Sequence, residues 1–334
     1  MSDQEHVWRD RRRWAGPILA LAAALTFALS VPASKALLGS TSQFAVAALL
    51  YLGAGLTLTL SRLVSGRLGR RDDGRAAATS TGVARGGRGD WTWLAAATLC
   101  GAVAAPLLLL WGLKVTPGAT ASLLLAFEAV FTALWAAGLF REHVTGQVWW
   151  AVVVVTAGGI LLGLEQGGRW GVSLGVVAVV AGCALWGLDN NLTRNIAVLE
   201  PSRVAQLKGL AAGTVNFLLL LAVGGSLPHW PAALALLAVG GLSYGVSLVL
   251  FVRVLRYLGS ARTGGYFGSA PFFAAAMSLV VAGNYPTLPL LVAAVLMLVG
   301  TVLMSSEQHV HKHDHDGMTH THWHVPDTEH RHAH

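Results

Sequence analysis

The most concentrated chemical groups in this 334-residue sequence lie at its end, where ten of the thirteen histidines fall in the last 26 residues. They alternate with other residues, including Asp314 and Asp316. Imidazole and carboxylate groups at this density bind zinc, nickel, cobalt or copper, without spacing that selects one metal. No cofactor is otherwise required. The predicted metal ligands are His309, His311, His313, His315, His320, His322, His324, His330, His332 and His334.

A second candidate is Glu128, which lies eleven residues into an apolar run of about 24 residues. If that run crosses a bilayer, an ionised carboxylate near its centre costs about 2.5 kcal/mol or more. Burial disfavours the charged form, so the carboxylate must face a cavity, meet a cation or hold a proton. We predict that Glu128 binds a coupling proton or a cationic substrate. The alternative is a structural carboxylate bonded to neighbouring hydroxyl groups.

Polar residues gather again near the end of another apolar run, at Trp186, Asp189, Asn190 and Asn191. Three consecutive polar side chains with an aromatic residue one turn earlier could form the mouth of a substrate site. Asp and Asn that cap a helix terminus would give the same pattern. Both interpretations stay open at this point.

Two basic residues occupy corresponding positions, because a shift of 159 residues pairs Lys35 with Arg194. They are candidate gates or counter-ions, and the alternative is that they extend to lipid headgroups. The same headgroup position is expected for Lys208 and Arg262. Pro32, just before Lys35, predicts a kinked or broken helix, which is common near transport sites.

The composition indicates what must hold these residues in place. Apolar residues make up 54% of the chain and charged residues 12%, whereas soluble proteins carry about 25% charged residues. This argues against a soluble enzyme, a disordered protein or a nucleic-acid-binding protein, and makes the lipid bilayer the expected partner. Cys100 and Cys183 lie in apolar runs and are expected to act as small hydrophobic side chains.

The sequence contains ten apolar runs long enough to cross a bilayer of about 30 Å. They predict an all-α integral membrane protein with ten transmembrane helices. Their approximate cores are Ala15–Ser34, Gln43–Ser61, Trp91–Leu113, Pro117–Phe140, Gly146–Leu164, Gly171–Asp189, Val204–Gly224, Pro231–Val252, Ala261–Val281 and Thr287–Met304.

The distribution of basic residues predicts the orientation. Only Lys35, Lys114 and Arg169 fall on one side of the predicted membrane, and the other twenty fall on the side of both termini. Because basic residues collect in the cytoplasm, both termini are expected there. The cytosolic parts are then a basic head at 1–14, a flexible loop at 62–90 and a disordered His-rich tail at 305–334. Cleavage of the first run as a signal peptide is the alternative, but it would leave nine helices.

The sequence also contains an internal repeat. A shift of 142 residues aligns Leu113–Leu161 with Leu255–Leu303 and gives nine identities. The matched helices are the third to fifth and the eighth to tenth, and an offset of five helices reverses their direction across the membrane. Inverted repeats of this kind are typical of transporters that hold a substrate between two halves.

The stretch Ala119–Leu134, followed by Arg141 and Glu142, resembles the fourth-helix signature of the EamA family in the drug/metabolite transporter superfamily. Its counterpart in the second half is Ala261–Ala275. The resemblance implies ten helices in two inverted five-helix repeats, at 15–164 and 171–304. It also implies solute movement, usually efflux, by alternating access.

We therefore expect a multi-pass transporter of the inner cell membrane that exports a small metabolite and is coupled to protons through Glu128. The alternative is a divalent metal exporter for nickel, cobalt or zinc whose cytosolic tail gathers the ion; a non-transporting membrane metal sensor is a further alternative. Motifs of ATP hydrolysis and of hydrolytic enzymes are absent from the sequence, so no enzymatic activity is expected. Nucleic acid is not an expected partner, and a homodimer is left open.

Overall fold

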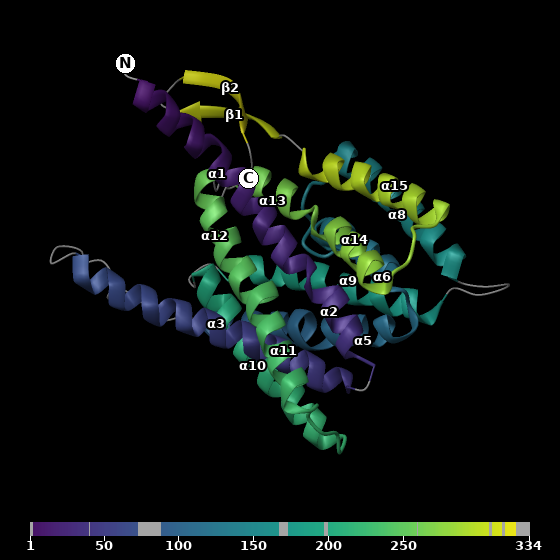
Figure 1. Cartoon of the computed structure of the whole chain (residues 1–334). Coiled ribbons are helices and arrows are strands. Elements are labelled where there is room, and N and C mark those ends of the chain that lie inside the picture. Colours follow the sequence, from purple (N-terminus) through teal and green to yellow (C-terminus); the bar gives the residue numbers. More distant parts are fainter. Residues whose placement is uncertain are drawn as a thin grey trace.

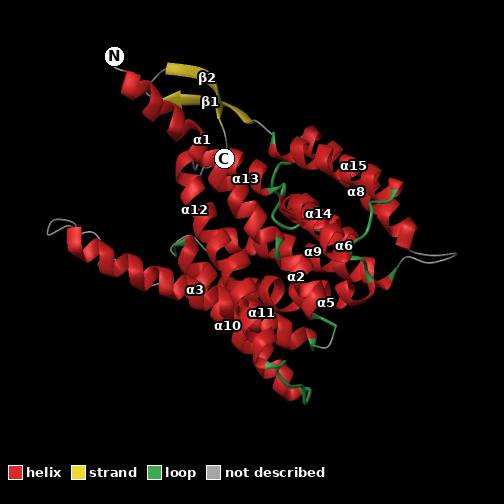
Figure 2. Cartoon of the chain, viewed as in Figure 1, coloured by secondary structure: helices red, strands yellow, loops and turns green. Residues whose placement is uncertain are grey.

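The computed structural model describes residues 3–39, 41–72, 88–166, 173–196, 200–258, 260–306, 309–315 and 318–324. The centre of the predicted loop, the start of the second repeat at residue 171, and His330, His332 and His334 lie outside these ranges. Figure 1 traces the chain through its helices, and Figure 2 shows that helices make up nearly all of the described residues.

Ten helical segments in the described part of the chain are long and apolar enough to span a membrane, which confirms the predicted number. Each lies within a few residues of a predicted run. They are Gly16–Leu37, Gln43–Val64, Gly89–Val115, Gly118–Gly138, Gly146–Glu165, Leu174–Arg194, Pro201–Ala222, Trp230–Val254, Gly265–Ala282 and Leu288–Ser305.

The first five spans contain several interrupted helices. α3 continues to residue 72 and α4 begins at residue 88, so the described ends of the predicted flexible loop are helical. The elements are α1 (Asp3–Ala28), α2 (Ser30–Leu37), α3 (Gln43–Asp72), α4 (Arg88–Ala97), the π-helix η2 (Thr98–Ala104), α5 (Ala105–Val115), α6 (Gly118–Leu124), α7 (Phe127–Gly138) and α8 (Gly146–Gln166).

The last five spans are followed by two strands, which lie in the tail that the sequence was expected to leave disordered. The helices are α9 (Leu174–Arg194), α10 (Pro201–Ala222), α11 (Trp230–Gly240), the π-helix η3 (Gly241–Val246), α12 (Ser247–Leu258), α13 (Ser260–Phe267), α14 (Ala270–Ala282) and α15 (Leu288–Ser305). The strands are β1 (His309–His315) and β2 (Met318–His324), which pair antiparallel.

The boundaries of these elements repeat along the chain. Adding 142 to the limits of η2 gives 240–246, and η3 occupies Gly241–Val246. The break between α6 and α7 at residues 125–126 likewise corresponds to the break between α13 and α14 at 268–269. This repetition includes irregular backbone that the sequence alignment does not reveal. The inverted orientation of the halves and the cytoplasmic position of the termini stay predictions.

The first span is broken where Pro32 predicts a break. α1 ends at Ala28 and α2 begins at Ser30. Proline has no backbone N–H, so Pro32 cannot donate to the carbonyl of Ala28, four residues earlier. The amide of Ala33 donates to the carbonyl of Leu29 at 3.1 Å and continues the helix beyond the break.

Neighbouring helices approach closely at small residues. α10 packs along α3, and α15 packs along α8. A Cβ atom on Gly209 would lie 3.0 Å from the backbone nitrogen of Gly55, and one on Gly213 would lie 2.6 Å from Cγ of Leu52. The spacing of four between Gly209 and Gly213 therefore serves close packing of two helices.

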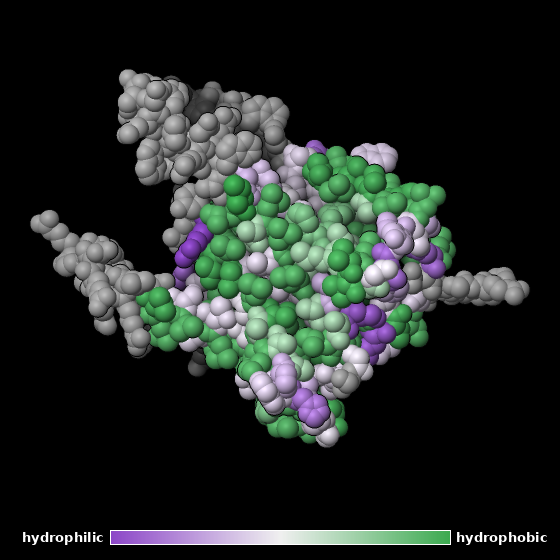
Figure 3. All heavy atoms as spheres, in the orientation of Figure 1, coloured by the Kyte–Doolittle hydropathy of each residue, from purple (hydrophilic) through white to green (hydrophobic). Residues whose placement is uncertain are grey.

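The surface of the helical bundle is largely apolar, as the broad hydrophobic areas in Figure 3 show. Large side chains such as Trp150, Val280 and Leu288 are 69%, 81% and 73% exposed. Such extensive exposure is unfavourable in water and is expected of a surface in contact with lipid. The ten spans and this surface identify a multi-pass membrane protein.

Candidate functional site

Glu128 lies immediately after the break in the fourth span. The amides of Leu125 and Ala126 donate to the carbonyls of Ser122 and Leu123, so the chain makes a tight turn between α6 and α7. Glu128 consequently falls in the first turn of α7. The N-terminus of a helix stabilises a negative charge, which makes this position more favourable for a carboxylate than the middle of an unbroken helix.

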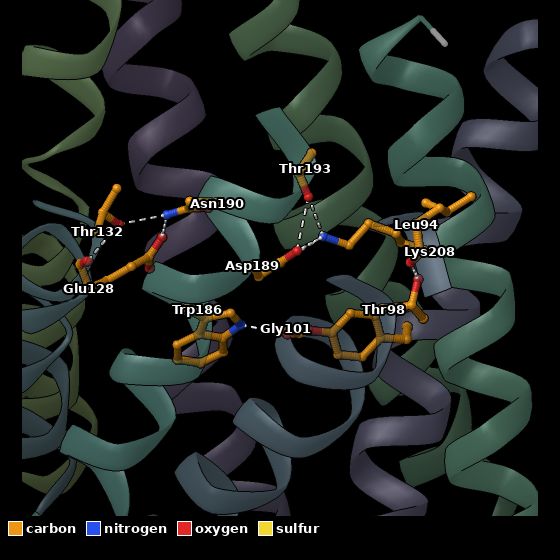
Figure 4. A network of polar contacts seen from close by, with 11 residues as sticks. Leu94, Thr98, Gly101, Glu128, Thr132, Trp186, Asp189, Asn190, Thr193 and Lys208 are labelled. Carbon is orange, nitrogen blue, oxygen red and sulfur yellow. Dashed lines mark hydrogen bonds and ion pairs between the residues drawn. The ribbon is translucent and has the colours of Figure 1, made fainter. Parts of the chain in front are cut away.

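The carboxylate of Glu128 meets neutral polar groups. Asn190 on α9 donates from Nδ2 to Oε1 of Glu128 at 3.0 Å and lies 3.2 Å from Oγ1 of Thr132. Thr132 in turn donates to the backbone carbonyl of Glu128 at 2.7 Å. The structure thus brings together two predicted site residues from different halves of the sequence, as Figure 4 shows. Within the described part of the chain, Glu128 forms no ion pair.

Asp189, the residue before Asn190, points to another side of α9 and has a cationic partner. Nζ of Lys208 on α10 lies 2.6 Å from Oδ2 of Asp189, and Thr193 donates to Oδ1 at 3.0 Å. The side chains of Lys208 and Asp189 are 15% and 10% exposed. The ion pair is therefore largely removed from solvent (Figure 4).

The expectation that Lys208 reaches lipid headgroups is wrong. Lys208 is the eighth residue of a 22-residue helix, and that depth was the signal for an internal partner. The capping interpretation of Asp189 and Asn190 is also wrong, because α9 continues to Arg194 and both side chains bond to neighbouring helices. The side chain of Arg262 lies outside the described part.

The π-helix η2 gives Asp189 its space and supplies an acceptor. A Cβ atom on Gly101 would lie 1.9 Å from Oδ2 of Asp189, so only glycine fits there. The Gly101 carbonyl accepts from Nε1 of Trp186 at 2.7 Å and from the hydroxyl of Tyr51 at 3.3 Å. A π-helical turn changes the regular hydrogen-bond ladder and is frequent at functional sites.

Aromatic rings from several spans form a wall beside this network. Tyr51 on α3 stacks on Tyr244 of η3, with ring centres 5.7 Å apart and planes 12° apart. Phe27 on α1 meets Tyr244 edge-on at 5.6 Å. With Trp186, these rings connect spans one, two, six and eight. Sequence analysis did not place Tyr51 here, since an aromatic residue in an apolar run carries no signal for its neighbours.

Asn191 ties α7 to α9. Its Nδ2 donates to the carbonyl of Thr132 at 3.0 Å and to that of Gly187 at 2.8 Å, and the residue is only 4% exposed. With both amide hydrogens directed to backbone carbonyls, Asn191 positions the helices that carry Glu128 and Asn190. This contact is separate from the carboxylate of Glu128.

The two basic residues paired by the repeat make different contacts. Nζ of Lys35 donates to the carbonyls of Leu113 and Thr116, the latter at 3.1 Å, and so binds the C-terminal end of α5. Arg194 instead lies 2.6 Å from Glu142, and these side chains are 66% and 35% exposed. Neither basic residue is placed in the Glu128 network.

A cavity of about 360 Å³ lies along α7 beyond Glu128. Phe131 and Trp135 follow Glu128 by three and seven residues and therefore share its side of the helix. The lining is mostly apolar and consists of Phe131, Leu134, Trp135, Gly138 and Leu139. The arrangement combines a carboxylate, neutral hydrogen-bonding groups and an adjoining apolar space.

Comparison with known proteins agrees with this architecture. The chain is 26% identical over 311 residues to an uncharacterized transporter of Methanothermobacter thermautotrophicus, covering 88% of this chain and 87% of that protein. A solved crystal structure of a protein matches with a TM-score of 0.60 and 19% identity, covering 86% of this chain and 96% of the other, and supports the fold alone. The model of the EamA-like transporter family matches residues 14–164 and 173–306, which are nearly all of the ten-helix region, and the chain therefore belongs to this family.

Proposed function

We propose that this transporter exports a small metabolite across the inner cell membrane by proton-coupled alternating access, with Glu128 as the proton-binding group. The observation that carries the proposal is the difference between two nearby carboxylates. Asp189 is neutralised by Lys208, whereas Glu128 accepts a hydrogen bond from the neutral Asn190. Protonation of Glu128 therefore changes the net charge of the network.

Asn190 suits both protonation states. Its amide N–H groups can donate to a carboxylate, and its amide oxygen can accept from a protonated carboxyl group. A small rotation of either side chain exchanges these hydrogen bonds without leaving a buried polar group unsatisfied. Proton uptake and release can then occur without disrupting the contact between α7 and α9.

The cavity along α7 indicates the kind of solute. Its volume of about 360 Å³ falls within the range of small-molecule sites. Phe131, Leu134 and Trp135 would contact an apolar part of the solute. Glu128, Asn190 and Trp186 would supply the polar contacts at the inner end.

We assign Lys35 and Arg194 to the two gates. Lys35 binds the C-terminal carbonyls of α5, where a cation is favoured by the helix dipole. At the same end of the bundle, α6 packs against α14, and Oγ of Ser122 lies 3.5 Å from Oγ of Ser278. These contacts support a closed gate at the Lys35 end, and the repeat predicts that Arg194 makes the equivalent closure in the opposite state.

Infrared difference spectroscopy of the purified protein tests the role of Glu128 without a known substrate. Titration should produce a protonated-carboxyl band that disappears in Glu128→Gln. The matched control is Glu142→Gln, which removes an exposed carboxylate paired with Arg194 and should leave the band unchanged. A titrating band that persists in Glu128→Gln would contradict the assignment.

Proteoliposomes enclosing a pH-sensitive dye test coupling directly. A panel of metabolites is added, and the internal pH is followed for the wild type and Glu128→Gln. We expect a solute-dependent proton flux only in the wild type. Equal flux in both proteins would show that the coupling proton binds elsewhere.

Export of a divalent metal is the second candidate, and the His-rich tail is the observation that favours it. Nickel, cobalt or zinc would be the cargo, gathered by the tail before transport. Deletion of residues 305–334 separates the candidates, because cellular tolerance to these metals should change only if the metal is the cargo. A non-transporting metal sensor would show no solute flux in proteoliposomes.

A further inference from the structure

The tail contains an ordered pairing of histidines that composition alone does not reveal. β1 and β2 pair antiparallel, with His309 opposite His324, His311 opposite His322 and His313 opposite His320. Three successive register positions of one type are thus occupied by histidine on both strands. His315 continues the alternation at the end of β1, opposite Met318.

This register places all seven of these histidines on one face of the hairpin. Alternate residues of a strand lie on the same face, and residues directly opposite each other share a face. The other face carries the pairs Val310–Trp323, Lys312–Thr321 and Asp314–Thr319. A shift of the pairing by one residue would divide the histidines between the two faces.

The dimensions of a β-ladder fit a metal ion held by several imidazoles. Directly opposite residues have Cβ atoms about 4.5–5.5 Å apart, and alternate residues along a strand are roughly 6.6–6.8 Å apart. Imidazole nitrogens bind zinc at about 2.0–2.1 Å. Two neighbouring cross-strand pairs can therefore supply up to four nitrogen ligands to one ion.

We propose that the β1–β2 hairpin is a binding site for a divalent transition-metal cation, centred on the quartet His311, His313, His320 and His322. The quartet comprises two adjacent cross-strand pairs with a third pair at His309 and His324 beside it. Copper is expected to bind more tightly than nickel or cobalt, according to the general order for such ligands. The site stands independently of the solute that the membrane helices transport.

Metal binding would also fix the register of the hairpin. An isolated two-stranded hairpin is marginally stable in water. Binding energy that requires both strands stabilises their pairing. The hairpin directly follows α15, so the proposed site is attached to the last membrane span by residues 306–308.

The test uses the full-length protein in detergent, with Cu²⁺ and Ni²⁺ as probes, isothermal titration calorimetry for affinity and electron paramagnetic resonance of the Cu²⁺ complex for its nitrogen ligands. Replacement of the quartet by alanine should remove the tightest binding phase and the signal of multiple nitrogen ligands. The control replaces Lys312, Asp314, Thr319 and Thr321, on the other face, and should retain both. A second control replaces His330, His332 and His334 and should also retain the tightest phase.

A composition-matched variant separates the hairpin site from binding by any His-rich tail. It exchanges neighbours on both strands, through His311→Lys with Lys312→His and Thr321→His with His322→Thr. The number of histidines is unchanged, but one pair moves to the opposite face. We expect weaker binding and fewer nitrogen ligands on copper, with unchanged thermal unfolding of the membrane region. Binding identical to the wild type, or loss of the tightest phase only when the three distal histidines are replaced, would overturn the proposal.

Discussion

Glu128 and Asp189 are two carboxylates of one polar network, but they are held in different ways. Asp189 faces Lys208 in a largely buried ion pair, and its space depends on the absence of a side chain at Gly101. Glu128 occupies the first turn of α7 and meets the amide of Asn190. The comparison indicates that Asp189 positions helices as part of a neutral pair, while Glu128 can change charge during transport.

The largest expected effect is on stability and falls on Asp189 rather than Glu128. Asp189→Asn leaves the ammonium group of Lys208 without its counter-ion, and breaking a buried pair costs about 3–5 kcal/mol. Glu128→Gln should change stability by no more than about 1 kcal/mol, because glutamine can still bond to Asn190. Thermal unfolding of the purified variants measures the difference.

The double variant Asp189→Asn with Lys208→Met is the control for this prediction. Removal of both charges should recover most of the stability lost in Asp189→Asn, since buried ion pairs are often replaceable by uncharged groups. Similar unfolding temperatures for Asp189→Asn and Glu128→Gln would show that the two carboxylates are not held differently.

A second prediction concerns the space that η2 leaves for Asp189. Gly101→Ala places a Cβ atom against Oδ2 of Asp189, and overpacking of this kind costs about 1–3 kcal/mol. The matched control is Gly146→Ala in the first turn of α8, where a Cβ atom meets nothing within 4 Å. Equal unfolding temperatures for these two variants would contradict the tight fit around Asp189.

The sequence predicts the spans well and their internal breaks unevenly. Uninterrupted apolar composition sets the length of a membrane helix, so all ten spans could be located. Pro32 announces the break after α1 because it removes a backbone donor. The break at residues 125–126 has no proline or glycine to mark it, and the π-helix η2 follows from packing around Gly101.

The site was predicted in part for similar reasons. Glu128, Asp189 and Asn190 are conspicuous because polar groups are costly in a membrane. Their division between two partners depends on which faces of α7, α9 and α10 meet, and that requires tertiary structure. Lys208 illustrates the limit, since its position near a span end suggested lipid headgroups while helix packing directs it to Asp189.

A third prediction tests whether Asn190 serves Glu128 rather than Asp189. In a double-mutant cycle, Asn190→Ala and Glu128→Gln should show a coupling energy of about 1 kcal/mol, the value of one hydrogen bond. Asn190→Ala and Asp189→Asn should be closer to additive, although these residues are adjacent in sequence. The free energies come from denaturant unfolding, and stronger coupling to Asp189 would reverse the assignment.

The smallest expected effect on stability is at the exposed pair of Arg194 and Glu142. Its side chains are 66% and 35% exposed, and exposed ion pairs contribute about 0–1 kcal/mol. Arg194→Ala should therefore leave the unfolding temperature nearly unchanged, and added salt should reduce any difference further. If Arg194 is nevertheless a gate, the same variant should alter the rate of solute flux in proteoliposomes. A large loss of stability would instead make the pair a structural contact comparable to Asp189 and Lys208.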